Sequence, residues 1–268
     1  LISKALDTAQ QKMGPVHINI PFDEPLYETI NQPILIQSVL KKELLNTSIQ
    51  ISNSTLKTWQ NAKRKLVLVG VKPPNSLESS IIEHLANDPS VIVLTETTSN
   101  LHHPNFFPSI DQLIAPLKKN EFKQLQPNLL VTFGGLIVSK KVKAFLRDYK
   151  PNQHWHIDNY MANDTYFCLN KHFKCIPNVF FKALFKSSKS SDSTYFKTWN
   201  AIKQLRLKRH TNYLKSMPFS DFKAFELISE AIPNNYMVQS GNSSAIRYLQ
   251  LFEFDSSIHL YCNRGTSG

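Results

Sequence analysis

The sequence predicts an α/β fold in which helices cover both faces of a parallel sheet. Short continuous apolar runs alternate with polar helical stretches through the middle of the chain. Such runs are typical of strands buried on both faces, and their alternation with helices favours right-handed βαβ units. Of the 268 residues, 41% are hydrophobic and 19% are charged, a globular composition that excludes disorder over the whole length.

The first residues predict a helix and a strand that belong to a domain present only in part. Residues 1–13 have a helical pattern, Gly14 and Pro15 end it, and residues 16–20 follow as a short strand. Residues 26–48 have little periodicity and are interpreted as an extended linker. A piece this short cannot bury a helix and a strand alone, so we expect the tail of a larger domain.

The central stretch, residues 49–185, predicts one complete Rossmann-like domain. Its helices are expected at 56–62, at 76–86 with Ser76 as the N-cap, and at 139–149. Its strands are expected at 65–70, 91–94, 129–135 and 154–158.

After residue 185 the sequence predicts a connector and the start of a further domain. Residues 186–194 are polar and are interpreted as a linker. The elements expected after it are helices at 195–214, 220–231 and 244–252, strands at 236–239 and 257–261, and a turn at 240–244. A new βαβ unit begins here and the chain stops inside it, so we expect this domain to be truncated.

The chain carries a formal charge of +11 with a pI near 9.5, and most of the excess lies in one stretch. Residues 161–215 hold eleven Lys and Arg against two Asp, a net of +9. We interpret this stretch as a basic surface helix or connector, and we expect no nucleic-acid partner. Nucleic-acid binding through residues 197–215 is kept as an alternative, although no nucleic-acid motif accompanies the charges.

Composition also bears on membranes, disulfides and metals. No uncharged apolar run approaches the roughly 20 residues of a membrane-spanning helix. Cys168, Cys175 and Cys262 form neither a disulfide framework nor a Cys-x-x-Cys pair, which favours a reducing, cytoplasmic location. His154 and His156 lie on one face of a strand without an evident carboxylate or cysteine partner, so no metal site is expected.

One candidate anion site follows the strand at 129–135. Gly134 and Gly135 precede a helix there, and glycines let backbone N–H groups approach a ligand at the carboxyl end of a strand. A tight strand-to-helix turn is the competing interpretation. Ser139, Lys140 and Lys141 begin the next helix and bring two cations near that edge, with plain surface lysines as the alternative.

A second candidate site follows the strand at 236–239. Ser243 and Arg247 are four residues apart and are expected on one helical face, and Arg264 follows the next strand. A guanidinium fork binds two carboxylate or phosphate oxygens at once. Two arginines at one sheet edge favour a polyanionic ligand, with capping and surface pairing as the alternative.

Three segments resemble one enzyme family. Residues 14–27 (GPVHINIPFDEPLY) resemble the end of the pyrimidine-binding domain of thiamine-diphosphate enzymes, in the form found in 2-succinyl-5-enolpyruvyl-6-hydroxy-3-cyclohexene-1-carboxylate synthases of the menaquinone pathway. Residues 241–247 (GNSSAIR) and 263–268 (NRGTSG) resemble the start of that family's diphosphate-binding domain. The implied domains are a pyrimidine-binding tail at 1–27, a linker at 28–48, a central domain at 49–185, a linker and basic helix at 186–210, and a truncated diphosphate-binding domain at 211–268.

The resemblance implies a carboligase that decarboxylates 2-oxoglutarate and adds the four-carbon unit to isochorismate. Its cofactors would be thiamine diphosphate and Mg²⁺ or Mn²⁺, and the full-length protein would be a homodimer or homotetramer. The implied substrate-binding residues are Ser243, Arg247, Arg264, Lys140 and Lys141, and the implied cofactor-binding residues are Gly241, Asn242 and Ser243. At Lys141 the family more often has arginine, which puts a bidentate role there in doubt.

The resemblance also implies that essential parts lie outside residues 1–268. The glutamate that activates the cofactor would precede Leu1, and the Gly-Asp-Gly metal-binding block would follow Gly268. We therefore expect no catalytic residue, no activity and no tightly bound cofactor in this chain alone. The alternatives are another thiamine-diphosphate carboligase, similar to acetolactate synthase, and a non-catalytic nucleotide- or anion-binding α/β module.

Overall fold

The computed structural model describes residues 1–12, 14–21 and 47–263. The chain divides into two compact units, Leu1–Leu45 and Asn46–Gly268, and each is described by itself. The finer domain boundaries expected at residues 27, 48, 185 and 210 stay predictions. Residues 22–46, which include most of the expected linker, lie outside the described residues, as does Arg264.

In the first unit, helix α1 (Ile2–Lys12) confirms the expected helix. The Gly14 N–H donates to Ala9 O, which closes the helix where glycine and proline interrupt the pattern. The strand expected at residues 16–20 is wrong, because this segment is not assigned to a strand. A strand requires a neighbouring strand for its backbone hydrogen bonds, and the described residues of this unit provide none.

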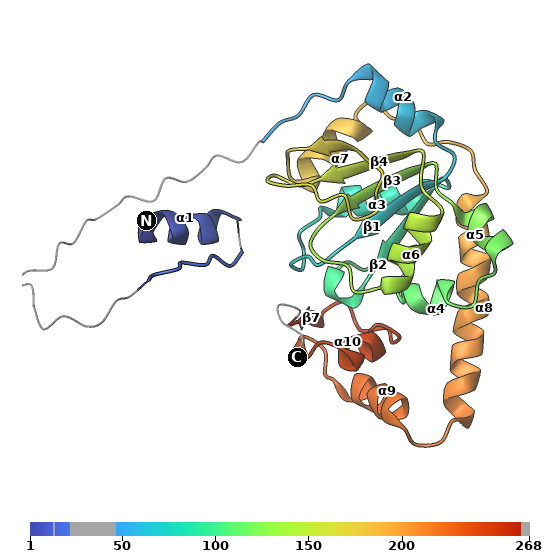
Figure 1. Cartoon of the computed structure of the whole chain (residues 1–268). Helices are drawn as coiled ribbons and strands as arrows, with labels where there is room; N and C mark the ends of the chain where they lie inside the picture. Colours follow the sequence, from blue (N-terminus) through green and yellow to red (C-terminus); the bar gives the residue numbers. More distant parts are fainter. Residues whose placement is uncertain (13, 22–46, 264–268) are drawn as a thin grey trace, which may run out of the picture. The chain divides into compact units, whose positions relative to one another are not determined.

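In the described part of the second unit, five parallel strands form one sheet (Figure 1). The strands are β1 (Lys65–Val69), β2 (Val91–Thr95), β3 (Leu129–Phe133), β4 (Gln153–Ile157) and β5 (Leu169–Phe173). Their order is β2-β1-β3-β4-β5. The parallel α/β prediction is confirmed, and β5 is an addition to it.

Alternate side chains of β1, β2 and β3 enter two separate cores. Val67 and Val69 of β1 pack on one face, whereas Leu66 and Leu68 pack on the other. The first core is covered by α2 (Asn53–Asn61), α3 (Ser79–Asn87) and α7 (Pro177–Phe185). The second is covered by α4 (Ile110–Ile114), α5 (Lys119–Leu125), α6 (Lys140–Asp148) and the start of α8 (Tyr195–Ser216).

The expected N-cap at Ser76 is wrong, because α3 begins at Ser79 with Glu78 in the cap position. Leu77 is buried, so the segment before α3 turns inward. The Asn178 side chain holds this turn: its Oδ1 accepts from the Glu78 N–H at 3.1 Å and its Nδ2 donates to Ser76 O at 3.3 Å. A tertiary contact therefore replaces the local cap.

Helix α8 leads from the sheet to the C-terminal part of the unit (Figure 1). The helix expected at 195–214 is confirmed, but part of it is buried, whereas a basic surface helix was expected; its role as a connector between domains stays a prediction. Trp199 is fully buried, Arg206 is 8% exposed, and Lys203 Nζ donates to Pro104 O and Phe106 O at 2.9 Å each. These cationic side chains therefore serve packing.

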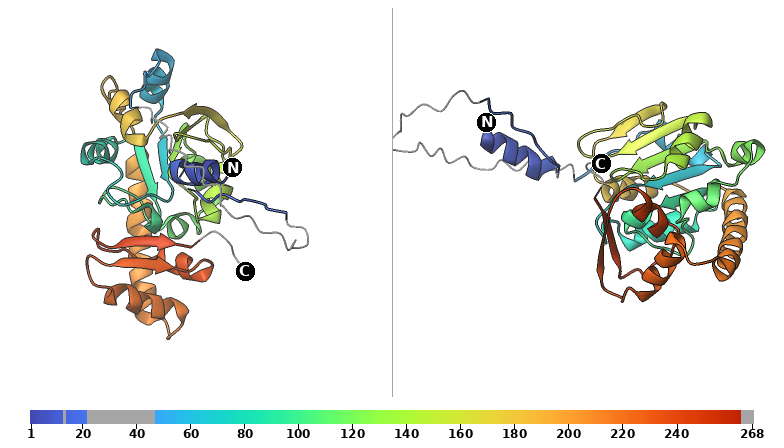
Figure 2. Two further views of the ribbon diagram at one scale, coloured as in Figure 1. Left: turned by 90° about the vertical axis from the view of Figure 1, so that its left-hand side faces the viewer. Right: turned by 60° about the horizontal axis from the view of Figure 1, so that its bottom comes forward.

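The C-terminal part contains α9 (Asp221–Ala231), β6 (Met237–Ser240), α10 (Ser244–Leu249) and β7 (His259–Cys262), drawn in orange to red in Figure 2. A short 3-10 turn of the central part, η1 (Thr97–Ser99), contacts β7. Strands β6 and β7 are parallel, as the expected βαβ unit requires. Leu249, Ile258 and Leu260 form a small core beneath them.

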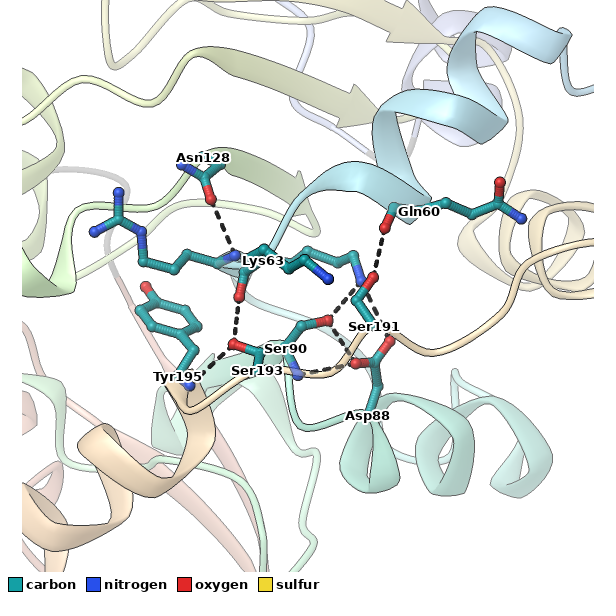
Figure 3. A network of polar contacts seen from close by, with 10 residues as sticks. Gln60, Lys63, Asp88, Ser90, Asn128, Ser191, Ser193 and Tyr195 are labelled. Atoms are coloured by element: carbon teal, nitrogen blue, oxygen red, sulfur yellow. Dashed lines mark hydrogen bonds and ion pairs between the residues drawn. The ribbon is translucent and has the colours of Figure 1, made fainter.

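A polar network fixes the segment at 186–194 to the amino end of the sheet (Figure 3). Ser191 Oγ donates to Gln60 O, and Ser193 Oγ donates to Lys63 O at 2.6 Å. The Tyr195 N–H donates to Ser193 Oγ at 3.0 Å and begins α8. The segment is irregular, as expected of a linker, but it is held against the sheet.

Candidate functional site

The carboxyl ends of β1 and β3 meet in a pair of glycine turns. The Gly70 N–H donates to Phe133 O at 2.9 Å, and the Gly135 N–H donates to Val71 O at 2.8 Å. Gly134 has φ +84°, a conformation that favours glycine. A Cβ at Gly70 would lie 2.0 Å from Gly135 O. The crevice between these central strands, where open α/β sheets bind ligands, is therefore closed by backbone.

The amino end of α6, which follows this turn, is occupied by a side chain of the protein. Glu96, at the end of β2, accepts from the Val138 N–H through Oε2 and from the Ser139 N–H through Oε1, both at 2.7 Å. These N–H groups belong to the N-cap residue of α6 and to the residue directly before it. Their occupation by a carboxylate counts against the alternative that this edge binds a dinucleotide.

Glu96 is 3% exposed and stands beside a second carboxylate. Burial raises the pKa of Glu96 to about 7, and nearby Asp111 adds to the effect, whereas the two backbone hydrogen bonds and Lys143 act in the opposite direction. Ser139 Oγ donates to Asp111 and accepts from the Val142 N–H at 3.1 Å. The first turn of α6 is therefore held by both acids.

Lys140 and Lys141 follow directly on this anchored turn. Ser139 is the N-cap of α6, so the helix begins where the sequence predicts. Both lysine side chains are exposed, at the carboxyl edge of the sheet. The role of these two lysines in binding a ligand stays a prediction.

The second candidate site follows β6. Ser243 has φ +66° and is the N-cap of α10, and Arg247 lies in the last turn of this short helix. Ser243 and Arg247 are both exposed. A Cβ at Gly241 would meet nothing within 4 Å, so the backbone there is open to a ligand. The turn and the helix confirm the expected local structure.

Asn100 joins the segment that follows β1 to strand β7. It ends η1 with φ +45°, and its Oδ1 accepts from the Leu260 N–H at 2.8 Å. Its Nδ2 donates to Leu260 O at 3.0 Å and to Lys72 O at 2.9 Å. One side chain thus pairs with the backbone of β7 as a neighbouring strand would.

Sequence reasoning missed Glu96 and Asn100. A signal was present, because residues 95–100 (TETTSN) form a run of polar residues directly after a buried strand. Such a run at the carboxyl end of a parallel strand is a place to look for functional or connecting side chains.

Residues 32–235 match a protein family described as "Middle domain of thiamine pyrophosphate". The chain belongs to this thiamine pyrophosphate middle-domain family.

Three curated relatives resemble this middle-domain chain along nearly all of its length, and each is named 2-succinyl-5-enolpyruvyl-6-hydroxy-3-cyclohexene-1-carboxylate synthase. The relative from Flavobacterium johnsoniae is 49% identical over 270 residues, covering 100% of this chain and 49% of the relative. The one from Christiangramia forsetii is 50% identical over 276 residues (100% and 48%), and the one from Porphyromonas gingivalis is 31% identical over 274 residues (96% and 46%). The chain spans about half the length of these relatives.

Two histidines of this thiamine pyrophosphate middle domain, His154 and His156, contact a threonine of β3. Thr132 Oγ1 lies 2.9 Å from His154 Nε2 and 2.7 Å from His156 Nδ1, so the two rings share one face as expected. Burial lowers the pKa of His154 to about 4, with His156 adding to the effect, so its ring is neutral at physiological pH. Among residues 1–12, 14–21 and 47–263, no group of three His, Cys, Asp or Glu is placed to hold a metal ion.

In the described part of this middle-domain chain, no helix combines the length and the apolar character that crossing a bilayer requires.

Proposed function

We propose that this chain is part of a thiamine-diphosphate-dependent 2-succinyl-5-enolpyruvyl-6-hydroxy-3-cyclohexene-1-carboxylate synthase. The enzyme would decarboxylate 2-oxoglutarate and add the four-carbon unit to isochorismate. The observation that carries the proposal is the 49% identity to a synthase of this name over the whole chain. Membership of the thiamine pyrophosphate middle-domain family supports the same cofactor independently.

The binding of two dicarboxylates is the task proposed for the cationic residues. Lys140 and Lys141 would approach from the amino end of α6, and Ser243, Arg247 and Arg264 would approach from the other sheet edge. Charged N–H donors form shorter and stronger hydrogen bonds to carboxylates than neutral donors do. The resemblance implies arginine more often than lysine at position 141. A lysine ammonium is a point charge, whereas a guanidinium forms two parallel hydrogen bonds to a carboxylate, so Lys141 would fix the orientation of a bound carboxylate less strictly.

Gly241, Asn242 and Ser243 would line the cofactor. The open space around Gly241 and the exposed turn that follows β6 fit the approach of a diphosphate. When bound, thiamine diphosphate supplies carbanion-stabilising chemistry, which belongs to the cofactor and not to the protein. A Mg²⁺ or Mn²⁺ ion would be held by residues after position 268, and activity would require a homodimer or homotetramer.

Turnover by the complete protein tests this proposal. A protein of the relatives' full length that includes residues 1–268 is incubated with thiamine diphosphate and Mg²⁺, and the product is identified by mass spectrometry. We expect carboligation with isochorismate plus 2-oxoglutarate and none with pyruvate alone. Acetolactate formation from pyruvate, without reaction of isochorismate, would support the acetolactate-synthase-like alternative instead.

Calorimetry on residues 1–268 tests whether this stretch alone binds the cofactor. We expect no turnover and weak or undetectable binding of thiamine diphosphate, because the activating glutamate and the metal-binding block would lie outside this stretch. Tight, Mg²⁺-dependent binding to residues 1–268 would contradict this part of the proposal.

A further inference from the structure

We propose that residues 96–100 act as a rigid spacer that sets the position of Lys140 and Lys141 relative to the β6–β7 strand pair. The inference rests on the proposed function, because it assigns these two elements to opposite sides of one substrate site. Glu96 and Asn100 are then positioning residues at the two ends of the spacer. Neither is expected to touch a substrate.

The first end of the spacer holds the lysine-bearing helix. The two carboxylate oxygens of Glu96 accept separately from the Val138 and Ser139 N–H groups. Two bonds to successive backbone groups fix both the place and the direction of the first turn of α6. Lys140 follows Ser139 directly, so these bonds restrain the position of its Cα.

The second end holds the strand pair. Asn100 pairs with both the N–H and the C=O of Leu260 in the middle of β7. Strand β7 in turn fixes β6, and the Asn263 N–H donates to Ser240 O at 3.0 Å beyond the ladder. Ser240 immediately precedes the turn that leads to Ser243. A displacement of Asn100 would therefore displace this turn as well, because backbone hydrogen bonds connect β7 to β6.

Between its ends the spacer is tied to β1 and cannot bend freely. The Glu96 N–H donates to Ser99 Oγ at 3.0 Å, and Ser99 Oγ donates to Val69 O at 2.8 Å. The Lys72 N–H donates to Thr98 O at 3.1 Å. Thr98 and Ser99 have no exposed surface. The spacer is thus bonded to the last residue of β1 and to Lys72, three residues further along the chain.

The substitution Asn100→Gly tests the spacer in the complete protein. Glycine adopts φ +45° without strain, so the backbone is preserved while the four side-chain hydrogen bonds, to Lys72 O, Thr98 O and both backbone groups of Leu260, are lost. We expect the KM for isochorismate or for 2-oxoglutarate to rise about tenfold with kcat changed less than threefold, because a small misplacement of binding groups is costly. The variant Asn100→Asp, which keeps the acceptor for the Leu260 N–H, is expected to have a smaller effect.

Asn128→Ala is the matched control. Asn128 Oδ1 also accepts from a backbone N–H, that of Arg64 at 3.1 Å, but at the amino edge of the sheet. We expect this variant to leave both KM values within twofold of the wild type. Equal changes in Asn100→Gly and Asn128→Ala, or unchanged KM values in both, would overturn the inference.

Hydrogen exchange on residues 1–268 separates the spacer from the proposed function. The Leu260 amide is expected to exchange about tenfold faster in Asn100→Gly than in the wild type, and at an unchanged rate in Asn128→Ala. Unchanged exchange at Leu260 in Asn100→Gly would overturn the spacer, whatever the activity. A complete wild-type protein without turnover of isochorismate would instead overturn the proposed function.

Discussion

Glu96 is a buried acid whose charge state depends on pH near neutrality. Its carboxylate lies directly after β2 and accepts hydrogen bonds from two backbone N–H groups. The titratable groups near it are Asp111 on α4, Lys143 on α6 and Tyr166 on the loop before β5. Burial is the largest influence and raises the pKa of Glu96 to about 7, from an ordinary value of 4.5. Ionisation of this residue therefore costs stability in the folded protein.

The substitution Glu96→Gln should remove a pH dependence of stability. A raised folded-state pKa gives stability that is fully present below pH 4.5 and is lost as pH rises through 7. The free energy of unfolding of the wild type should therefore fall by about 3 kcal/mol relative to Glu96→Gln between pH 4.5 and 7.5. Urea unfolding of both proteins across this range measures the difference. A constant difference would show that Glu96 titrates as an ordinary glutamate.

Gly70 is closely surrounded by backbone and Gly241 is not, so alanine substitutions at the two positions can be compared directly. A Cβ at Gly70 would lie 2.0 Å from Gly135 O, whereas one at Gly241 would meet nothing within 4 Å. Gly70→Ala should therefore lower the free energy of unfolding by about 3 kcal/mol through steric overlap with backbone. Gly241→Ala should change it by less than about 0.5 kcal/mol. Equal unfolding midpoints for the two variants would contradict the close approach of the two glycine turns.

At the scale of elements, a buried ion pair joins the start of β1 to the turn before β2. Lys65 Nζ lies 3.3 Å from Asp88 Oδ2 and donates to Ser90 Oγ at 2.6 Å, and both charged side chains are almost fully buried. Burial lowers the pKa of Lys65, and the contact with Asp88 opposes this. The pair lies in the polar network that also fixes the segment before α8 (Figure 3).

Removing one partner of this pair should be strongly destabilising. Asp88→Ala leaves the Lys65 ammonium buried without its counter-charge, and we expect the free energy of unfolding to fall by about 3–5 kcal/mol. Glu78→Ala is the control, because its ion pair with Lys182 is about half exposed and should contribute no more than about 1 kcal/mol. Chemical denaturation compares them, and a loss below 1 kcal/mol in Asp88→Ala would refute the importance of the buried pair.

The strands that the sequence predicts best are those buried on both faces. β1 to β4 each contain an apolar run or alternation that identifies them, and all are found near their expected positions. β5 (Leu169–Phe173) escaped prediction because its residues are only partly buried and its sequence is largely polar. The strand expected at 16–20 has a suitable pattern, yet a strand needs a partner that local sequence cannot provide.

The candidate site is predictable where glycine and charge mark it. Gly134 and Lys140 follow from the rule that ligands bind at the carboxyl ends of parallel strands. Glu96 and Asn100 do not follow from it, because their partners Ser139 and Leu260 are 43 and 160 residues away in sequence. Only the folded structure brings such pairs together.

At the scale of the whole molecule, the charge of +11 separates into two parts with different roles. Part of the excess on α8 is used in packing, as Lys203 and Arg206 illustrate. Lys140, Lys141 and Arg247 are instead exposed at the carboxyl ends of strands or just beyond them. The bulk charge therefore gives less information about binding than the location of these few cations.

The central claim is that the two lysines at the start of α6 bind substrate carboxylates in a synthase of this family. The most direct measurement is the steady-state kinetics of the complete protein and its Lys140→Ala/Lys141→Ala variant with isochorismate and 2-oxoglutarate. We predict turnover by the wild type and a loss of at least about 100-fold in kcat/KM in the variant, with an unfolding midpoint close to the wild type because both side chains are exposed. A wild type that does not consume isochorismate, or a variant with unchanged kcat/KM, would contradict the account.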